Sequence, residues 1–333
     1  SNLPLRKERN NMTEINNTNI NDIDLNDPNL FEKKIADESS SEHLAAPKYS
    51  YWGSVWRNFF HNKLAMFLLV VIIIVFLFAF IQPLVSGYDA MKTPNINNKA
   101  MHYIRPFKQS GLIFGTDDKG NSLFDALWAG TKNSLFLAVM ATLITETIGV
   151  VIGMFWGFSK KIDAVMIEVY NVLSNIPTTL IAMILVYALG GGMKQLIFAL
   201  CITTWVGTAY FIRVQVMIIR DREYNLASKC LGTPTYKIIQ NNVLPYLVSV
   251  IITSVSRDIP LFISTEVALS FMGVGLSEEV PSLGKMVQQY APYMTSASYM
   301  FWIPVFTAAI VSVSLYIVGQ ALADASDPRT HML

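Results

Sequence analysis

The stretch REYNLASKCLG at residues 222–232, followed after ten residues by VLP at 243–245, decides the fold of this chain. It is a polar, charged island between two long apolar runs. Helical spacing over 223–231 places polar residues on one side and apolar residues on the other. Gly232 permits a turn with positive φ, and Pro234 prevents the helix from simply continuing.

A second short helix over 235–242 is expected to lead into the next apolar run. Two short helices that meet at a small residue can insert as one wedge into a groove of a soluble partner. Rigid-body movement can then cross the membrane surface. The alternative is a generic amphipathic loop between two membrane spans, which would transmit no force.

The composition predicts a membrane protein. Of 333 residues, 52% are hydrophobic and 15% are charged, whereas soluble proteins carry about 25% charged residues. Several apolar stretches run for roughly 18 to 25 residues, the length of a helix that crosses the hydrocarbon core. We therefore predict an all-α integral membrane protein surrounded by membrane lipid. The net charge of +1 indicates no nucleic-acid partner, and Cys201 and Cys230 form neither a disulfide framework nor a metal-ligand spacing.

Hydropathy and composition divide the chain into segments. Residues 1–49 are rich in Asn, Asp, Glu and Lys and poor in aromatic residues, so we expect a disordered cytoplasmic tail. The segments that follow are an interfacial elbow helix over 50–63, a first transmembrane helix over 64–86, an extracellular loop over 87–133, a core of five transmembrane helices over 134–323 with a coupling loop at 220–245, and a cytoplasmic tail over 324–333. The five core spans are expected near 134–158, 164–189, 196–219, 245–271 and 299–321.

The elbow helix has aromatic residues on one side and cations on another, which is typical of a helix that lies in the membrane interface. An ordinary aromatic belt at the start of a span is the alternative. The aromatic side holds Trp52, Val55, Trp56, Phe59 and Phe60. Among the short loops, Lys and Arg residues concentrate on one side of the six spans, which predicts that both termini are cytoplasmic. The long loop on the other side is also basic, but long loops cross the membrane with less regard to charge.

The polar island resembles the coupling loop of permease subunits of ABC importers. Those permeases carry Glu-Ala-Ala, three residues, Gly, nine residues, Ile, one residue and Leu-Pro. This chain keeps four of these positions: Ala227, Gly232, Leu244 and Pro245. The departures are Leu226 for Glu, Ser228 for Ala and Asn242 for Ile. Contact with an ATPase therefore cannot rest on an acid at position 226, and Glu223, one helical turn earlier, is the candidate substitute.

Further segments resemble the oligopeptide and dipeptide permeases within that class, most of all those of Gram-positive oligopeptide importers. The similarity covers about residues 50–330. Residues 114–124 resemble an outer-loop signature of these permeases, although Asn121 and Ser122 stand where the signature has Arg and Asp. The other matching segments are 50–67, 266–275, 281–284 and 319–329.

The resemblance implies a type I ABC importer permease fold and a non-catalytic subunit of a bacterial cell-membrane transporter. It implies no cofactor in this chain, since ATP and Mg would be bound by partner ATPase subunits. The implied partners are a second homologous permease, two cytoplasmic ATPases and an extracellular lipid-anchored peptide-binding protein. The implied contacts with the ATPases are Ala227, Gly232, Leu244 and Pro245, and Glu223 joins them as the candidate substitute for the missing acid.

Charged residues inside the fifth core span are candidates for the translocation path. Arg257, Asp258 and Glu266 lie at membrane depth, where a charge costs a few kcal/mol and therefore usually faces a cavity or a partner. They could meet the termini or backbone of a peptide. The alternatives are an ion pair between subunits and a pair of neighbours, Arg257 and Asp258, that compensate each other.

Gly149, Gly153 and Gly157 repeat every four residues and predict a flat helix face on which another helix packs closely. The run 115–122 places two glycines as a phosphate-binding loop does, but it lacks the lysine that would reach a phosphate, so turn chemistry explains it better.

Rival functions differ in what they need. A proton-driven peptide carrier needs a carboxylate relay, for which Glu146 and Asp258 are the candidates. A channel or scaffold needs no coupling loop. Among ABC importers, dipeptides, glutathione and nickel chelates are alternative solutes.

Overall fold

A computed structural model describes residues 51–277 and 279–327 of the chain. Every element in these residues is a helix, apart from an isolated bridge between Thr116 and Ser122. The predicted all-α architecture is therefore confirmed. The elements are α2 (Tyr51–His61), α3 (Lys63–Ser86), η4 (Lys99–Met101), α4 (Leu123–Phe158), α5 (Lys160–Ser174), α6 (Thr178–Ala188), α7 (Met193–Arg220), α8 (Glu223–Cys230), α9 (Thr235–Ile238), the π-helix η5 (Ile239–Val243), α10 (Leu244–Phe271), α11 (Leu283–Tyr290), η6 (Ala291–Tyr293) and α12 (Ser298–Ala325).

Five helices are long and apolar enough to cross a membrane: α3, α4, α7, the continuous helix from α9 to α10, and α12. The pair of α5 and α6 makes a sixth span only if it is counted as one, because its two helices are bent by 77°. An unbroken span over 164–189 was therefore the wrong prediction. The break falls at Asn175–Pro177, where proline lacks an amide hydrogen and disfavours helical backbone in the residue before it.

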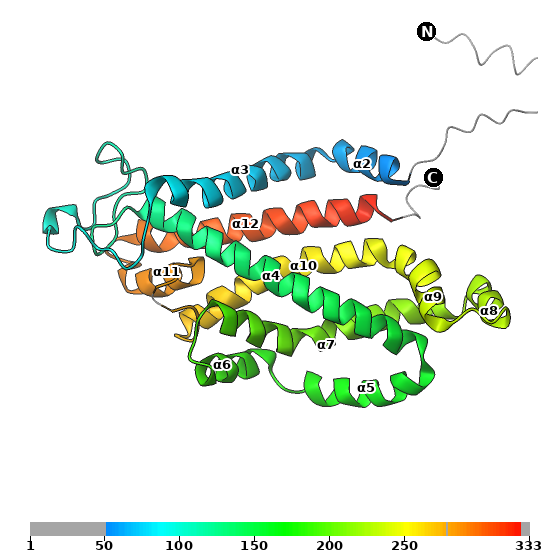
Figure 1. The fold of residues 1–333 in the computed structure, drawn as a ribbon. Coiled ribbons are helices and arrows are strands. Elements are labelled where there is room, and N and C mark those ends of the chain that lie inside the picture. Colours follow the sequence, from blue (N-terminus) through cyan, green and yellow to red (C-terminus); the bar gives the residue numbers. More distant parts are fainter. Residues whose placement is uncertain (1–50, 278, 328–333) are drawn as a thin grey trace, which may run out of the picture. The chain divides into compact units, whose positions relative to one another are not determined.

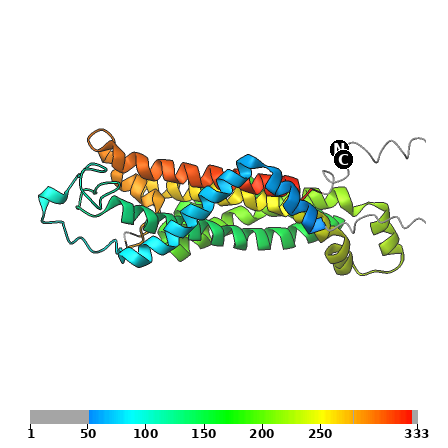
Figure 2. The ribbon, with the colours of Figure 1, turned by 90° about the horizontal axis from the view of Figure 1, so that it is seen from above.

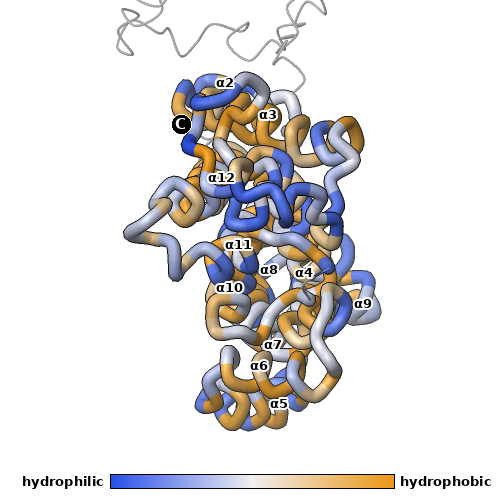
Figure 3. The backbone as a smooth tube through the Cα atoms, turned by 90° about the vertical axis from the view of Figure 1, so that its left-hand side faces the viewer, coloured by the Kyte–Doolittle hydropathy of each residue, from blue (hydrophilic) through white to orange (hydrophobic). Residues whose placement is uncertain are grey.

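The helices place two sets of elements at opposite ends of the bundle (Figure 1). At one end lie α8 and α9, with α2 and the last turn of α12; we call this the α8 end. At the other lie α11 and the loop between α3 and α4; we call this the α11 end. Figure 3 looks onto the α11 end, where hydrophilic segments surround α11.

The predicted glycine face on α4 is confirmed. A Cβ atom on Gly149 would lie 2.6 Å from Thr208 Cβ, and one on Gly153 would lie 2.6 Å from the carbonyl oxygen of Ala209. On Gly157 it would lie 2.7 Å from the carbonyl oxygen of Arg213. These small residues therefore let α4 and α7 pack backbone to backbone along the half of both helices nearer the α8 end.

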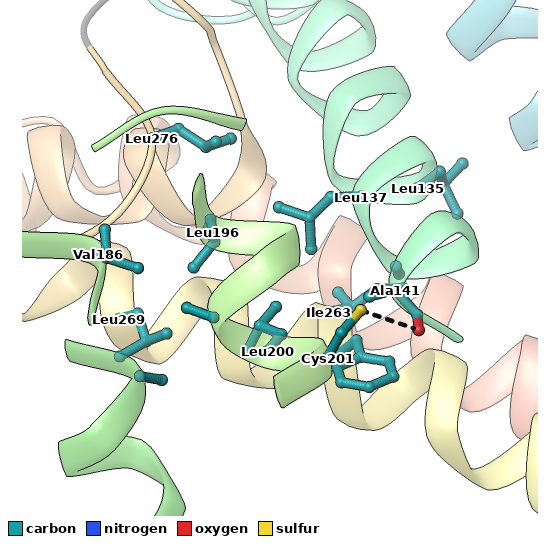
Figure 4. Close-up of a cluster of buried hydrophobic side chains, with 14 of the residues drawn as sticks. Leu135, Leu137, Ala141, Val186, Leu196, Leu200, Cys201, Ile263, Leu269 and Leu276 are labelled. Carbon is teal, nitrogen blue, oxygen red and sulfur yellow. Dashed lines mark hydrogen bonds between the residues drawn. The ribbon is translucent and has the colours of Figure 1, made fainter. Parts of the chain in front are cut away.

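An apolar cluster joins α4, α6, α7 and α10 (Figure 4). Leu137, Leu196 and Ile263 are among its buried members. The thiol of Cys201 in this cluster donates to the carbonyl oxygen of Ala141 at 3.6 Å. In Figure 2, α3 crosses the bundle at an angle, and its side chains are mostly exposed, as expected for a helix that faces lipid.

The elbow helix α2 divides its apolar residues between two surfaces. Val55 and Phe59 are buried in a cluster with residues of α12, and Tyr51 donates a 2.6 Å hydrogen bond to the carbonyl oxygen of Ser326. Trp52 and Trp56 are about half exposed. Asn62 then caps α3 by accepting from the amide of Ala65 at 3.1 Å. Packing against α12 thus fixes the helix, while the exposed aromatics remain free for a membrane interface.

Several predicted boundaries differ from the helix bounds. Helix α4 begins at Leu123, inside the segment predicted as the loop 87–133, because Ser122 caps it by accepting from the amide of Asp125. Helix α12 continues to Ala325, past the predicted end of the core at 323. The predicted disordered tail over 1–49 and the last residues of the predicted tail over 324–333 lie outside the described residues.

Candidate functional site

The polar island folds as two short helices that turn sharply at Gly232. Helix α8 ends at Cys230, and Gly232 has φ of +77°. No atom within 4 Å would meet a Cβ there, so the glycine is required for its backbone conformation and not for space. Pro234 then precedes α9. The predicted turn with positive φ is confirmed, whereas the predicted helix over 235–242 is α9 followed by the π-helix η5.

Two asparagines hold the coupling loop together. Asn225 is fully buried; its Nδ2 donates to the carbonyl oxygen of Ile219 at 2.9 Å. The Nδ2 of Asn242 donates to Asn225 Oδ1 at 2.9 Å and lies 3.4 Å from the hydroxyl of Ser228. Asn242 and Ser228 are two of the three departures from the permease pattern. The structure brings them together, so a polar contact stands where the pattern has two apolar residues.

The outer surface of the coupling loop is exposed and partly apolar. Glu223 begins α8, where a negative charge suits the helix N-terminus. Among the other predicted contact positions, Ala227 and Pro245 are exposed and Leu244 is half-buried at the start of α10. Large exposed apolar side chains accompany them: Tyr224, Leu226, Leu231 and Tyr236. Such a patch is typical of a protein interaction surface.

The coupling loop is tied to the C-terminal end of α4. The guanidinium of Arg220 donates to the carbonyl oxygen of Gly157 at 3.0 Å and forms an ion pair with Asp221 at 3.1 Å. The hydrogen bond from Arg220 lowers the pKa of the Asp221 carboxyl below its ordinary value. The ammonium of Lys229 lies 4.5 Å from the ring centre of Phe158, the last residue of α4.

A cluster of charged side chains lies between α4 and α10. Arg257 Nε donates to Asp258 Oδ1 at 3.0 Å, so the predicted neighbour pair exists. Ser254 donates to Glu146 Oε1 at 2.6 Å, while Glu146 Oε2 is buried and has no hydrogen-bond partner among the described residues. Asp258 is an electrostatic neighbour of Glu146. The side chain of Asp258 is 6% exposed and that of Arg257 is 49% exposed.

Arg257 and Asp258 line a cavity of about 320 Å³ between α5, α6, α7 and α10. Hydroxyl side chains from three of these helices complete much of its wall: Tyr170, Ser174, Thr178, Thr203, Thr204 and Thr208. Helix α5 has no buried residue and is held by Asp163, which accepts from Trp156 Nε1 at 2.8 Å and from Arg213 Nη2 at 3.0 Å.

Glu266 lies elsewhere on α10 and does not line this cavity. It is fully buried and accepts hydrogen bonds from the hydroxyls of Ser134, Ser270 and Ser282 at 2.9, 3.0 and 2.7 Å. Ser134 in turn accepts from the amide of Leu283, the first residue of α11. The carboxyl group therefore holds α11 against α4 and α10. Of the three predicted path residues, the structure brings together Arg257 and Asp258 and separates them from Glu266.

The run 115–122, in the loop between α3 and α4, forms a turn around Asp117. Gly115 and Gly120 have positive φ, and the Asp117 carboxyl accepts from the amides of Lys119 and Asn121 at 2.9 and 2.7 Å. Burial raises the pKa of this carboxyl above its ordinary value. The loop and α11 enclose a polar cavity of about 390 Å³ that Asp118 and Lys285 also line.

Sequence reasoning missed the link between Asn225 and Asn242 and the arrangement of Glu146 beside Asp258. Asn242 was recognised only as a departure from a pattern, and Glu146 only as part of a rival mechanism. In both cases, the signal available in the sequence was the polar residue itself, at position 242 or at position 146. Among the described residues, no group of three or more His, Cys, Asp or Glu side chains could hold a metal ion.

Comparison with known proteins identifies relatives over most of the chain. The family model for the binding-protein-dependent transport system inner membrane component matches residues 149–332. The model for the N-terminal transmembrane domain of oligopeptide transport permease C matches residues 50–106.

Individual relatives of the chain are transport permeases as well. The chain is 49% identical to the oligopeptide transport system permease protein AmiD of Streptococcus pneumoniae, over 89% of this chain and 95% of that protein. It is 34% identical to the dipeptide permease DppC of Bacillus subtilis (87% and 89%) and 31% identical to the oligopeptide permease OppC of the same organism (90% and 97%). Among solved structures, the inward-facing MetNI methionine ABC transporter is similar with a TM-score of 0.48, 16% identity and coverage of 61% of this chain and 95% of that chain.

The resemblance found in the sequence is therefore confirmed over both the N-terminal segment and the helical core. The described helices supply the membrane spans that such a protein needs. The chain belongs to the family of binding-protein-dependent transport system inner membrane components, the multi-pass permease subunits of ABC importers, and has their type I permease fold.

Proposed function

We propose that this chain is the transmembrane permease subunit of an ATP-driven oligopeptide importer and forms half of its translocation path. The observation that carries the proposal is the 49% identity to AmiD along nearly the whole length of both proteins. The match of residues 50–106 to the N-terminal domain of oligopeptide permeases supports the same solute.

The subunit would work without catalytic residues of its own. A second, homologous permease would complete the path, and two cytoplasmic ATPases would bind ATP and Mg and contact the coupling loop. An extracellular lipid-anchored protein would deliver the peptide. The exposed apolar surface of α8 and α9, with Glu223, Ala227 and Gly232 in it and Leu244 and Pro245 at its root, supports this assignment of the ATPase contact.

We propose that both termini are cytoplasmic in a bacterial cell membrane. Helix α2 and the end of α12 lie at the α8 end, together with the coupling loop (Figure 1). Arg220, Lys229 and Lys237 also lie at this end, and an excess of basic residues is typical of cytoplasmic loops. The α11 end would then face the binding protein.

Arg257 and Asp258 are the residues that we assign to the path, since they line a cavity between four helices. Glu266 was the third candidate for the path, but its complete burial and its three hydroxyl donors support a role in holding α11.

The test is purification of the chain from its native membrane in mild detergent, with identification of the proteins that accompany it. A second permease, two ATPases and ATP hydrolysis stimulated by peptide and binding protein are the expected results. A chain that is isolated only with copies of itself, and that transports solute without ATPases, would contradict the proposal.

Dipeptide import is the second candidate, because the chain is also 34% identical to a dipeptide permease. Uptake of a length series from two to eight residues by the same complex separates the two solutes. Family membership leaves no support for a proton-driven carrier or a channel.

A further inference from the structure

We propose that Arg257 binds the C-terminal carboxylate of the transported peptide in the cavity between α5, α6, α7 and α10. This inference rests on the proposed import of peptides and adds the chemical group that is recognised. The protein leaves part of the hydrogen-bonding capacity of the Arg257 guanidinium unused.

Arg257 has five N–H donors. Its Nε donates to Asp258, and its Nη2 makes one long contact of 3.5 Å with Ser254 Oγ. Nη1 has no hydrogen-bond partner in the described part of the chain. The group also lies 5.2 Å from the ring centre of Phe211, which supports it from one side. With the Nε edge occupied, the end that carries Nη1 and Nη2 remains available for a ligand.

The position of Arg257 requires a partner for these donors. The residue lies within a helix long and apolar enough to span the membrane, yet half of its side chain is exposed. A charge at that depth is stabilised only by water, by protein or by a ligand. Because the exposed part lines a cavity of about 320 Å³, a solute that enters the cavity can reach it.

The side chains that line the cavity favour a ligand that carries a hydrogen-bond acceptor. The carboxyl groups nearby belong to Asp258 and Glu146, whose residues are only 4% and 5% exposed and present little surface to a solute. A guanidinium offers only donors, and its end matches a carboxylate with two parallel hydrogen bonds. Asp258 therefore orients Arg257 through its Nε, while the end of the guanidinium that carries Nη1 and Nη2 faces the solute.

Hydroxyl groups in the cavity wall supply hydrogen-bond acceptors in addition to the donors of Arg257. Thr203 and Thr204 donate to carbonyl oxygens of their own helix, Thr203 to Ala199 at 2.9 Å and Thr204 to Leu200 at 2.7 Å. Thr204 Oγ1 also accepts from Thr145 Oγ1 at 3.3 Å. Each of the two hydroxyl oxygens keeps a lone pair that can accept an N–H group of a peptide backbone. A site built from one cation and neutral hydroxyls would recognise the main chain of a peptide and tolerate many side chains.

The experiment compares uptake of matched peptides by the complete transporter. Each peptide is offered as the free acid and as the C-terminal amide, to wild type and to Arg257→Gln. We expect the wild type to have the lower KM for the free acid. Arg257→Gln should raise the KM for the acid about tenfold, as loss of a hydrogen bond to a charged group predicts, and leave the KM for the amide almost unchanged.

Two further variants serve as controls. Arg257→Lys keeps the charge and should retain part of the preference for the acid. Leu261→Gln changes an exposed side chain of the same cavity, one turn along α10, and should leave the ratio of the two KM values unchanged. Any preference of the binding protein itself is the same in every variant, so a changed ratio reports on the permease.

An unchanged ratio in an active Arg257→Gln transporter would overturn the inference and leave the importer function intact. Loss of the second permease from purified Arg257→Gln, with retention in Arg257→Lys, would also overturn it, in favour of an ion pair between subunits. If the wild-type complex imports no peptide at all, the proposed function itself fails, and that result is distinguishable from both.

Discussion

Two regions along helix α10 differ in how completely the buried carboxyl groups there are hydrogen-bonded. Near the C-terminal end of α10, Glu266 receives three hydroxyl hydrogen bonds from α4, α10 and the start of α11. Near the middle of α10, Ser254 donates to Glu146 of α4 and Arg257 pairs with Asp258, while Glu146 Oε2 lacks a hydrogen-bond partner in the described residues.

One helix can therefore be held rigidly in one region and remain adaptable in another. A fully satisfied buried network specifies one geometry, because every displacement breaks a bond. A network with an unused acceptor and unused donors can rearrange around a solute at smaller cost. We therefore assign Glu266 to stability and the cluster at Arg257 to function.

The largest expected effect is that of Glu266→Ala. It leaves three buried hydroxyls without their acceptor, and each costs about 1 kcal/mol or more, so we expect a loss of about 3 kcal/mol or more. Thermal unfolding of the purified protein in detergent measures it. Glu279→Ala, an exposed control, should change little. Equal effects of the two substitutions would remove the distinction between the two regions.

Asn242→Asp tests whether the hydrogen bond between Asn242 and Asn225 makes the coupling loop rigid. The substitution places a carboxylate oxygen against Asn225 Oδ1, where a donor stood, at an expected cost of about 1–3 kcal/mol. Peptide-stimulated ATP hydrolysis should fall while basal hydrolysis persists. Asn241→Asp makes the same charge change on an exposed neighbour and should preserve stimulation.

Ser282→Ala should have a smaller effect. It removes one of the three donors to Glu266 and the cap of α11, where Ser282 accepts from the amide of Lys285. A loss of about 1–2 kcal/mol follows from these two bonds. Hydrogen exchange of the α11 amides measures it locally, and unaltered exchange would show that the network does not hold α11.

The smallest expected effect on stability is that of Glu146→Gln. The amide oxygen can still accept from Ser254, and the amide nitrogen supplies a donor toward Asp258, so we expect a change below about 1 kcal/mol. The same unfolding assay as for Glu266→Ala gives the comparison. A destabilisation as large as that of Glu266→Ala would mean that both carboxyl groups are structural.

Local patterns predicted the fold well, because helical spacing and turn chemistry depend on neighbouring residues. The glycines at 149, 153 and 157 and the turn at Gly232 are examples. Pro177 was a local signal for the bend that precedes it, but the apolar composition of 164–189 led to the prediction of a single span.

The site was harder to predict, because its contacts join distant residues. Glu266 meets Ser134 from another helix, and Asn225 meets Asn242 across the turn. Hydropathy identifies a charge at membrane depth, but only the packing of α4 and α10 shows which carboxyl group is satisfied.

The continuity of α9, η5 and α10 has a mechanical consequence. Residues Thr235–Phe271 form one continuous helical segment of 37 residues, in which the π-helix η5 separates α9 from α10. With Glu266 as a fixed pivot, the arm along α10 to Leu244 is about 33 Å and the arm to Arg257 is about 14 Å, at 1.5 Å per residue. A tilt of α10 by about 10° would move Leu244, where the coupling loop joins it, by about 6 Å and Arg257 by only about 2 Å. A large movement of the coupling loop would then become a displacement at Arg257 that is large enough to break one hydrogen bond.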